Sequence, residues 1–391
     1  MPKILVAAYG GGHARLLIPV IRDLEARGHE VTVLGLTLGK AVFNQANITA
    51  VGLYDILQYS PRWCELERLG KSVLKELDIH PQIGWNDSLA YIGSGLLDLI
   101  ETQGEAEAMD QYVTLGRKAF DQSITANEIL LTTECDVLVT TSAPRMERAL
   151  VRASTTLNVR SVVVVDLFAS IEKSWLTAPT FANCICVFHE LVKQILVEGG
   201  RPARDIVVTG NPAFDAISAI PDKRFVRDKP HVLFLSVPDS LIGDKYESVN
   251  SDRVVHVLGE GVSKGHFTAE IRFHPNEREA IREQVRGKLL DRSMSHSLED
   301  TLADADIVVT ECSTAGIQAQ LLGLPVVKLG WSSRSTLVPL EKLAPTWIAQ
   351  SEEQLLVQIE LASAAGRFPR IDGLGMATSR VVNQIERIAR D

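Results

Sequence analysis

The chain has 391 residues, of which 46% are hydrophobic and 23% charged, which excludes a disordered or fibrous protein. At roughly 150 residues per domain, this length predicts two domains. The formal net charge of −9 gives no general attraction to nucleic acid or anionic lipid, so no nucleic-acid partner and at most peripheral membrane contact are expected. Five cysteines without dense spacing, and no apolar run of ~18 residues, predict a cytoplasmic protein with reduced thiols.

The N-terminal half alternates short β-branched runs with amphipathic helical segments. Residues 3–8 form an apolar run, Gly10–Gly12 predict a turn, and large apolar residues then recur at helical spacing up to residue 28. Further strands are predicted at 30–34, 137–140, 161–165, 185–188 and 206–208. Strands that alternate with helices form parallel sheets through right-handed crossovers.

Residues 55–130 differ from this pattern, because they are helical and carry Trp63, Trp85, Tyr91 and Tyr112 among charged residues. They predict either a helical insertion over the sheet edge or, equally, helices that cover a sheet face. A polar, proline-containing stretch at 219–230 is the best candidate for a linker.

After this stretch the alternation of strands and helices resumes. Strands are predicted at 231–236, 268–273, 307–310 and 326–329, and helices at 277–286, 314–322 and 378–390. The sequence therefore predicts an α/β protein with two doubly wound, Rossmann-like domains facing a cleft. The expected domains are 1–218 and 219–375, with a C-terminal helix at 376–391 that packs back on the first domain.

The first strand-to-helix turn, from Tyr9 to His13, places backbone N–H groups where anions bind. It is not the dinucleotide fingerprint, because Arg15 stands at the third glycine position and the second strand ends without an acid for a ribose. No Walker-type glycine-lysine sequence occurs either. A nicotinamide dehydrogenase and a Walker-type ATPase are therefore disfavoured.

The second half carries two phosphate-type signals. Ser313 and Thr314 follow a buried strand and open a helix, where hydroxyls and backbone donors suit a phosphate, although Ser313 is also an ordinary N-cap. Arg272, His274 and Pro275 end another strand of the same unit. Because parallel strands end on one edge of a sheet, a phosphate role is favoured over a purely structural histidine.

These features together resemble one known superfamily. The glycine-rich first turn ending in His13, paired with residues 304–327 (DADIVVTECSTAGIQAQLLGLPVV), looks like the GT-B glycosyltransferases and UDP-N-acetylglucosamine 2-epimerases. Thr209-Gly210-Asn211 is similar to the Thr-Gly-Asn motif at the interdomain boundary of these proteins. The resemblance spans both halves of the chain.

The resemblance implies residue roles. Gly11, Gly12 and His13 resemble the Gly-Gly-His loop of the peptidoglycan N-acetylglucosaminyltransferase, which faces the donor phosphates and the acceptor. Asn211 belongs to the same nucleotide-sugar site. Gln318 stands where the family usually has a glutamate that grips the ribose hydroxyls, and an amide loses the charge-assisted bond.

For the second half, the resemblance implies that Ser313 and Thr314 hold the donor diphosphate, or the single phosphate of a CMP-sugar. Arg272, His274 and Pro275 are similar to the His-Pro motif of bacterial sialyltransferases and of glycerol-phosphate and Kdo transferases. The donor in those enzymes is a cytidine nucleotide, so UDP-, CMP- and dTDP-linked sugars all stay open.

The resemblance predicts a metal-independent glycosyltransferase, without a cofactor, that moves a sugar to a hydroxyl of a glycan, lipid-linked or small-molecule acceptor in cell-surface polysaccharide or glycoconjugate synthesis. Catalytic base candidates are His13, Asp166 at the end of a strand, and Glu311. Cys184 and Cys186 are expected to be core thiols rather than metal ligands. Homodimer formation is compatible with this prediction.

Two alternatives remain. A 2-epimerase shares the fold and the nucleotide site, but its usual Gly-Thr-Arg-Pro-Glu and His-Arg-Arg-Glu-Asn sequences are replaced here by Tyr9–His13 and Ser236–Ser240. An inactive sugar-nucleotide-binding protein is the second alternative, and Gln318 in place of glutamate keeps it open.

Overall fold

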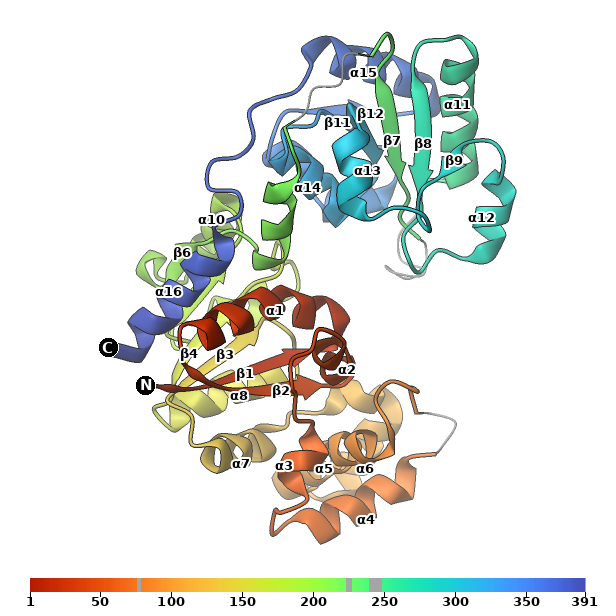
Figure 1. Cartoon of the computed structure of the whole chain (residues 1–391). Coiled ribbons are helices and arrows are strands. Elements are labelled where there is room, and N and C mark those ends of the chain that lie inside the picture. Colours follow the sequence, from red (N-terminus) through yellow and green to blue (C-terminus); the bar gives the residue numbers. More distant parts are fainter. Residues whose placement is uncertain (76–78, 223–226, 239–247, 391) are drawn as a thin grey trace. The chain divides into compact units, whose positions relative to one another are not determined.

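The structure is a computed structural model that describes residues 1–75, 79–222, 227–238 and 248–390 (Figure 1). It divides into two compact units, Met1–Asp215 with Met376–Asp391, and Ala216–Gly375. Each unit contains a six-stranded sheet whose pairings are parallel. The predicted class of two Rossmann-like α/β domains is thus confirmed. Residues 223–226 of the predicted linker, and Asp239 and Ser240, lie outside the described residues.

The sheet of the first unit has the strand order β2-β1-β3-β4-β5-β6. Its strands are β1 (Lys3–Tyr9), β2 (Glu30–Leu36), β3 (Val137–Thr141), β4 (Arg160–Val164), β5 (Cys184–Val187) and β6 (Ile206–Val208). Ile4 to Ala8 of β1 are at most 1% exposed. A parallel strand covered on both faces needs such an unbroken apolar run.

The helices that flank this sheet are α1 (Gly10–Ala26), α2 (Leu38–Gln45), α8 (Met146–Thr156), α9 (Lys173–Leu176) and α10 (Glu190–Glu198). The separate turn predicted at Gly10–Gly12 is wrong, because Tyr9 is the N-cap of α1 and the three glycines form its first turn. Gly10 has a φ of +68°, a conformation that glycine adopts without steric cost. Strand β1 therefore runs directly into the helix that carries His13.

The described residues between 53 and 133 are mainly helical, as predicted for the segment 55–130 that is rich in aromatic residues. They are α3 (Leu53–Leu57), α4 (Trp63–Val73), α5 (Trp85–Gln103), α6 (Glu105–Leu115) and α7 (Ser123–Thr133). Helix α3 contacts β2, the edge strand of the sheet, and α7 contacts α8. Helix α5 is the centre of this group, since it contacts α3, α4, α6 and α7.

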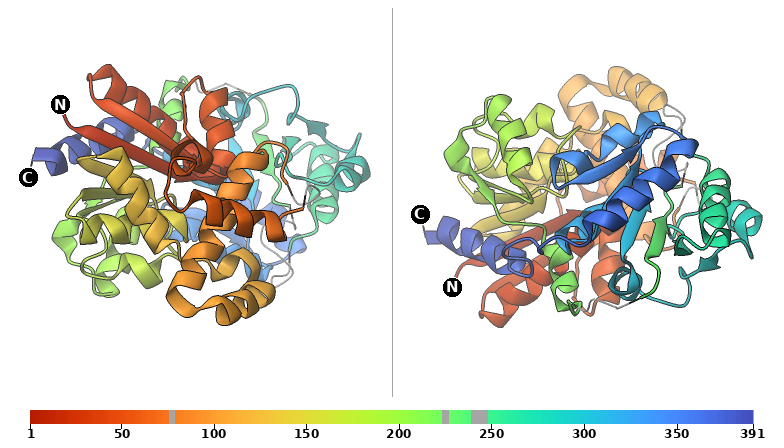
Figure 2. Two further views of the ribbon diagram at one scale, coloured as in Figure 1. Left: turned by 90° about the horizontal axis from the view of Figure 1, so that it is seen from below. Right: turned by 90° about the horizontal axis from the view of Figure 1, so that it is seen from above.

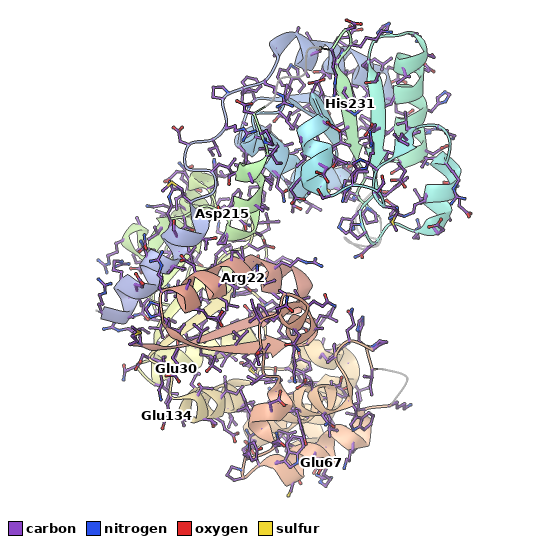
Figure 3. All side chains as sticks on the ribbon, viewed as in Figure 1. Arg22, Glu30, Glu67, Glu134, Asp215 and His231 are labelled. Carbon is purple, nitrogen blue, oxygen red and sulfur yellow. The ribbon has the colours of Figure 1, made fainter. Side chains whose placement is uncertain are left out.

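The last helix, α16 (Ala377–Arg390), belongs to the first unit. It contacts α1 and strands β3, β4 and β5, and its Val381, Val382 and Ile385 are fully buried in the core there. The Asp215 carboxylate accepts the N–H groups of Ala377 and Thr378 at 3.0 and 2.7 Å and so caps this helix (Figure 3). The two chain ends consequently lie in the same unit (Figure 2).

The sheet of the second unit has the order β12-β11-β10-β7-β8-β9. Its strands are β7 (His231–Leu235), β8 (Thr268–Arg272), β9 (Leu290–Asp291), β10 (Ile307–Thr310), β11 (Val326–Leu329) and β12 (Thr346–Ala349). The helices are α11 (Ser251–Ser263), α12 (Glu279–Val285), α13 (Leu298–Asp304), α14 (Thr314–Leu321) and α15 (Glu352–Ala365). No helix in the described residues is both long and apolar enough to cross a membrane.

Candidate functional site

His13 lies in the first turn of α1, and a hydrogen bond to another element holds its side chain in place. Its Nδ1 lies 2.8 Å from Thr141 Oγ1, and that hydroxyl donates to Glu147 Oε2 at 2.6 Å. Because the single hydroxyl proton of Thr141 is donated to the carboxylate, Thr141 Oγ1 accepts a hydrogen bond from His13 Nδ1–H. This assignment leaves Nε2 of neutral His13 with a free lone pair, so His13 can act as a base.

Glu147 is the fixed anion of this chain of hydrogen bonds. It lies in the first turn of α8, its side chain is fully buried, and its Oε1 also accepts the N–H of Tyr9 at 2.6 Å. Burial by itself lowers the pKa of His13, but Glu147, together with Asp166 and Glu172, outweighs it and raises that pKa above its usual value. The site therefore stabilises the imidazolium that forms when His13 takes a proton.

Asp166 and Asn211 extend this site from two neighbouring loops. Asn211 Nδ2 donates to the backbone oxygen of Asp166 at 2.9 Å and lies 3.5 Å from its carboxylate, while Asn211 Oδ1 accepts the N–H of Ala213. Burial raises the pKa of Asp166, against the opposing effects of His13 and Asn211. Three residues predicted from separate parts of the chain, His13, Asp166 and Asn211, are thus brought together.

Gly11 and Gly12 complete the first turn of α1. A Cβ at Gly11 would meet Val42 at 3.8 Å, an ordinary contact, and a Cβ at Gly12 would meet nothing within 4 Å. Packing inside the chain therefore does not require these two glycines. Their small size leaves the backbone of this turn open to a ligand, which is compatible with the predicted binding role.

In the second unit, Ser313 is the N-cap of α14. Its hydroxyl accepts the N–H of Ala315 at 3.1 Å, as in an ordinary helix cap. Thr314 is exposed, and Gln318 lies one helical turn further on, half-buried. Residues four apart lie on the same face of a helix, so Thr314 and Gln318 present one polar surface beside the helix N-terminus.

Arg272 is the last residue of β8 and His274 lies two residues beyond it, and each side chain already forms hydrogen bonds with backbone groups. Arg272 Nη1 donates to the carbonyl oxygen of His296 at 2.7 Å, with longer bonds to Arg292 and Ser297. His274 Nδ1 accepts the N–H of Asn276 at 3.1 Å, and burial lowers its pKa, so neutral His274 carries its proton on Nε2.

A ligand would therefore meet His274 as a neutral N–H donor, not as a cation. Pro275, the next residue, is exposed. Over the described ranges, no hydrogen bond joins Arg272 or His274 to Ser313 or Thr314. The phosphate-type residues of this unit share a sheet edge but are not linked to one another as the residues around His13 are.

Glu311, the third base candidate, is buried in an ion pair. It follows β10, and its Oε2 accepts from Arg334 Nη2 at 2.8 Å, with both side chains at most 4% exposed. Oε1 accepts from Ser332 Oγ and from the Val249 N–H. Burial raises the pKa of Glu311, against the opposing effects of Ser332 and Arg334. With these partners, Glu311 is suited to hold the loop after β11 rather than to move a proton.

Cys184 and Cys186 lie in the hydrophobic core of the first unit and are fully buried. Among the described residues, no group of three or more His, Cys, Asp or Glu side chains could hold a metal ion. Sequence reasoning missed Thr141 and Glu147, since a strand-end threonine and a glutamate in a first helical turn are both commonplace. The position of Glu147 on the buried face of α8 is the one sequence signal that could have singled it out.

Comparisons with known proteins identify the fold. No family model and no curated protein matches the chain. Among solved structures, it resembles the UDP-GlcNAc 2-epimerase of Methanocaldococcus jannaschii in complex with UDP-GlcNAc and UDP, with a TM-score of 0.60, 14% identity, and coverage of 98% of this chain and 99% of that one.

Two further structures show the same likeness. The UDP-GlcNAc 2-epimerase of Neisseria meningitidis, bound to UDP-GlcNAc, has a TM-score of 0.59 and 14% identity over 98% of this chain and 100% of that one. MurG of Acinetobacter baumannii has a TM-score of 0.59 and 12% identity over 99% and 100%. The chain thus shares its fold, the two-domain GT-B fold, with these UDP-GlcNAc 2-epimerases and with MurG.

Proposed function

We propose that this protein is a glycosyltransferase that moves a sugar from a nucleotide-sugar donor to a hydroxyl acceptor without a metal ion. The observation that carries the proposal is the hydrogen-bonded chain from His13 through Thr141 to the buried Glu147. It leaves His13 Nε2 as a proton acceptor and stabilises the product imidazolium. A base of this kind is what an acceptor hydroxyl needs in order to attack a sugar.

In this proposal, His13 Nε2 removes the proton of the acceptor hydroxyl as its oxygen bonds to the anomeric carbon. The bond from that carbon to the donor phosphate breaks, and the nucleotide leaves with the electron pair. The N-terminus of α14, with Ser313 and Thr314, stabilises the negative charge on the leaving phosphate. Asp166, the alternative base, supports the charged form of His13.

The remaining residues act by binding. Gly11, Gly12 and Asn211 would form the wall of the site around His13, and Gln318 would hydrogen-bond the ribose. His274 would donate Nε2–H to a phosphate oxygen, with Arg272 and Pro275 shaping the loop that presents it. The donor is a UDP-, CMP- or dTDP-linked sugar, and the acceptor is a glycan, a lipid-linked molecule or a small molecule.

A 2-epimerase is the second candidate, because UDP-GlcNAc 2-epimerases recur among the similar structures. It would use the same nucleotide site but would remove and return a proton on the sugar itself. The two functions differ in a measurable way, because epimerisation in D₂O places deuterium on the sugar without releasing nucleotide.

The experiment therefore has two steps. A thermal-shift screen with UDP, CDP, CMP, GDP and dTDP identifies the nucleotide, because a ligand that binds the native state raises its stability. The matching sugar nucleotides are then incubated in D₂O with and without candidate acceptors. Nucleotide release that increases with acceptor supports the transferase, whereas deuterium on unreleased sugar supports the epimerase. Nucleotide binding with neither reaction indicates an inactive binding protein.

A further inference from the structure

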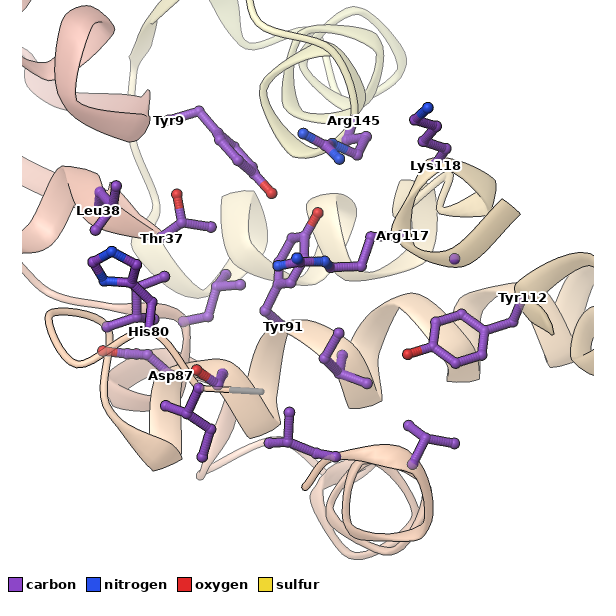
Figure 4. A pocket seen from close by; sticks show the side chains of 18 of the residues that line it. Tyr9, Thr37, Leu38, His80, Asp87, Tyr91, Tyr112, Arg117, Lys118 and Arg145 are labelled. Carbon is purple, nitrogen blue, oxygen red and sulfur yellow. The ribbon is translucent and has the colours of Figure 1, made fainter. Parts of the chain in front are cut away.

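The first unit contains a cavity of about 940 Å³ between the helices of residues 53–133 and the carboxyl ends of β1 and β2. Tyr9, Thr37, Tyr91, Arg117 and Arg145 are among its lining residues (Figure 4). Tyr9 connects the cavity to the His13 site, because its N–H donates to Glu147. Ligand cavities in proteins commonly measure about 300–1,000 Å³, so this one can hold an organic molecule.

Three cations, called here the cation cluster, line this cavity: Arg117 and Arg145 beside the tyrosines Tyr9 and Tyr91, and Lys118 further out (Figure 4). Over the ranges that the structure describes, none of the three forms a salt bridge with a carboxylate. Asp87 is the one acid among the described lining residues, and Lys40 already pairs with it at 3.0 Å. The charge that faces the cavity is therefore positive.

Buried polar groups at the cation cluster point to a ligand. The Nε of Arg145 is buried without a hydrogen-bond partner. The hydroxyls of Tyr9 and of Tyr91, a side chain only 4% exposed, point toward each other beside Arg117 and Arg145 (Figure 4), and a hydrogen bond between them uses only one of the two phenol protons. Buried polar groups normally find a partner, so the second phenol proton and the Arg145 Nε–H indicate an acceptor atom supplied from outside the chain.

The backbone at the rim of the cavity is strained. Arg145 has a φ of +66° and Thr37 a φ of +52°, in a region that favours glycine. Arg145 also lies over the ring of Tyr9, 5.1 Å from its centre. Strained backbone of this kind clusters at functional sites, and here it directs a cation toward the two tyrosines.

The cavity lining also contains a set of apolar side chains, called here the apolar wall. It comprises Leu74, Ile83, Ile92 and Leu115, with the ring of Tyr112. A small inorganic anion would leave this wall without a partner. The ligand must therefore join an anionic group to an apolar substituent.

We propose that this cavity binds a phosphate monoester with an apolar substituent, the phosphate at the cation cluster and the substituent along the apolar wall. A phosphate fits better than a carboxylate, because three cations and two phenol hydroxyls offer more donors than two oxygens accept. Since Tyr9 links the cavity to His13, the bound molecule is the acceptor. Only this last statement rests on the proposed function.

The test measures binding of decyl phosphate, phenyl phosphate, decanol and inorganic phosphate to the full chain by titration calorimetry. Saturable binding of an ester, at least tenfold tighter than decanol and than inorganic phosphate, is expected. If decyl phosphate binds more tightly than phenyl phosphate, the natural ligand is a lipid phosphate. If phenyl phosphate binds more tightly, the natural ligand is a soluble phosphate ester. Equal affinity for inorganic phosphate and the esters, or no saturable binding, would overturn the proposal.

Two variants of the cavity and one control test whether ester binding depends on the cation cluster and its tyrosines rather than on net charge or folding. Arg145→Gly removes the cation while glycine tolerates the φ of +66°, so the fold is retained and ester affinity falls at least tenfold. Tyr91→Phe keeps the ring and removes the hydroxyl, with a smaller loss. Arg204→Ala, at an 88% exposed arginine of the same unit outside the cavity, keeps full affinity. Equal losses in Arg204→Ala and Arg145→Gly would overturn the proposal.

Failure of this proposal is distinguishable from failure of the glycosyltransferase function. Nucleotide affinity is measured on the same samples. Nucleotide binding and transfer without ester binding would remove the proposed cavity ligand and leave the transferase. Ester binding that requires Arg145, in a protein that binds no nucleotide, would support the cavity and remove the transferase.

Discussion

Glu147 in the first unit and Glu311 in the second are both buried glutamates beside a strand-to-helix turn, yet their partners differ. Glu147 accepts from Thr141, which in turn bonds His13, whereas Glu311 lies against the guanidinium of Arg334. A permanent cation neutralises Glu311, but the imidazole near Glu147 is charged only after it gains a proton. The partner, rather than the position in the fold, thus decides whether a buried carboxylate can assist proton transfer.

The largest effect is expected from His13→Ala. This change removes the proposed base, so turnover falls by about 10²–10⁴-fold while nucleotide affinity is retained. Steady-state kinetics and calorimetry on the same protein measure the two quantities. His256→Ala, at a 73% exposed histidine of the second unit, is the matched control and keeps both. A His13→Ala protein with normal turnover and weak nucleotide binding would show that the base lies elsewhere.

Glu311→Gln is expected to act on stability instead. It removes the carboxylate charge that the buried Arg334 contacts at 2.8 Å, which costs about 3–5 kcal/mol and is measured by urea denaturation. A second change, Arg334→Met, removes the buried guanidinium as well and recovers part of the loss. If Glu311→Gln instead abolished turnover in a fully stable protein, the contrast between the two glutamates would fail.

Glu147→Gln tests the same contrast through pH. The single amide oxygen can still accept the Tyr9 N–H, while the amide NH2 takes the place of the oxygen that accepts from Thr141, and the neutral side chain no longer raises the pKa of His13. In the wild type, turnover falls as the pH falls through this raised pKa, because protonated His13 cannot act as a base. In Glu147→Gln, this fall on the acidic side of the pH–turnover profile, called here the acidic limb, moves to lower pH. Maximal turnover drops by roughly tenfold or more, because the imidazolium is less stable.

Glu134→Gln, at a 77% exposed acid of the same unit, is the control for this experiment (Figure 3). Its acidic limb stays in place. An acidic limb that did not move in Glu147→Gln would mean that the limb reports another group. The same pKa shift also has a consequence for folding, since the stability that charged His13 contributes is lost as the pH rises through its raised native pKa.

The sequence alone predicted those features that depend only on residues close together in the chain. Apolar runs predicted β1, β3 and β10, and strand ends placed His13 and Asp166 at one edge of the first sheet. Asn211 was singled out by its resemblance to a Thr-Gly-Asn motif instead, and it lies beside Asp166. The edge strands β9 and β12 were missed, because β9 has only two residues and β12, Thr346–Ala349, lacks the adjacent isoleucine and valine residues that mark β10 and β11. Glu147 was missed for another reason, since only its partners distinguish it from a surface acid on a helix.

In the second unit, strand ends predict which residues share a sheet edge but not what those residues bind. Arg272, His274 and Ser313 lie at or just after the ends of strands of one sheet, as predicted. The sequence could not show that their side chains already form hydrogen bonds with backbone groups. A side chain's neighbours in space come from residues far away in the chain, such as His296 for Arg272. Their roles in binding a nucleotide therefore stay predictions until binding is measured.

The smallest effect is expected from Ser313→Ala, because the hydroxyl would serve both the helix and the ligand. Loss of the cap lowers stability by about 1 kcal/mol, and loss of one hydrogen bond to phosphate weakens nucleotide binding by roughly fivefold. Ser313→Asn separates the two, since asparagine caps a helix as well as serine does. Restored stability with persistently weak nucleotide binding would assign Ser313 to the ligand. Affinity that returned together with stability would leave Ser313 as an N-cap alone, and the second unit's contribution would then lie in the backbone N–H groups of α14.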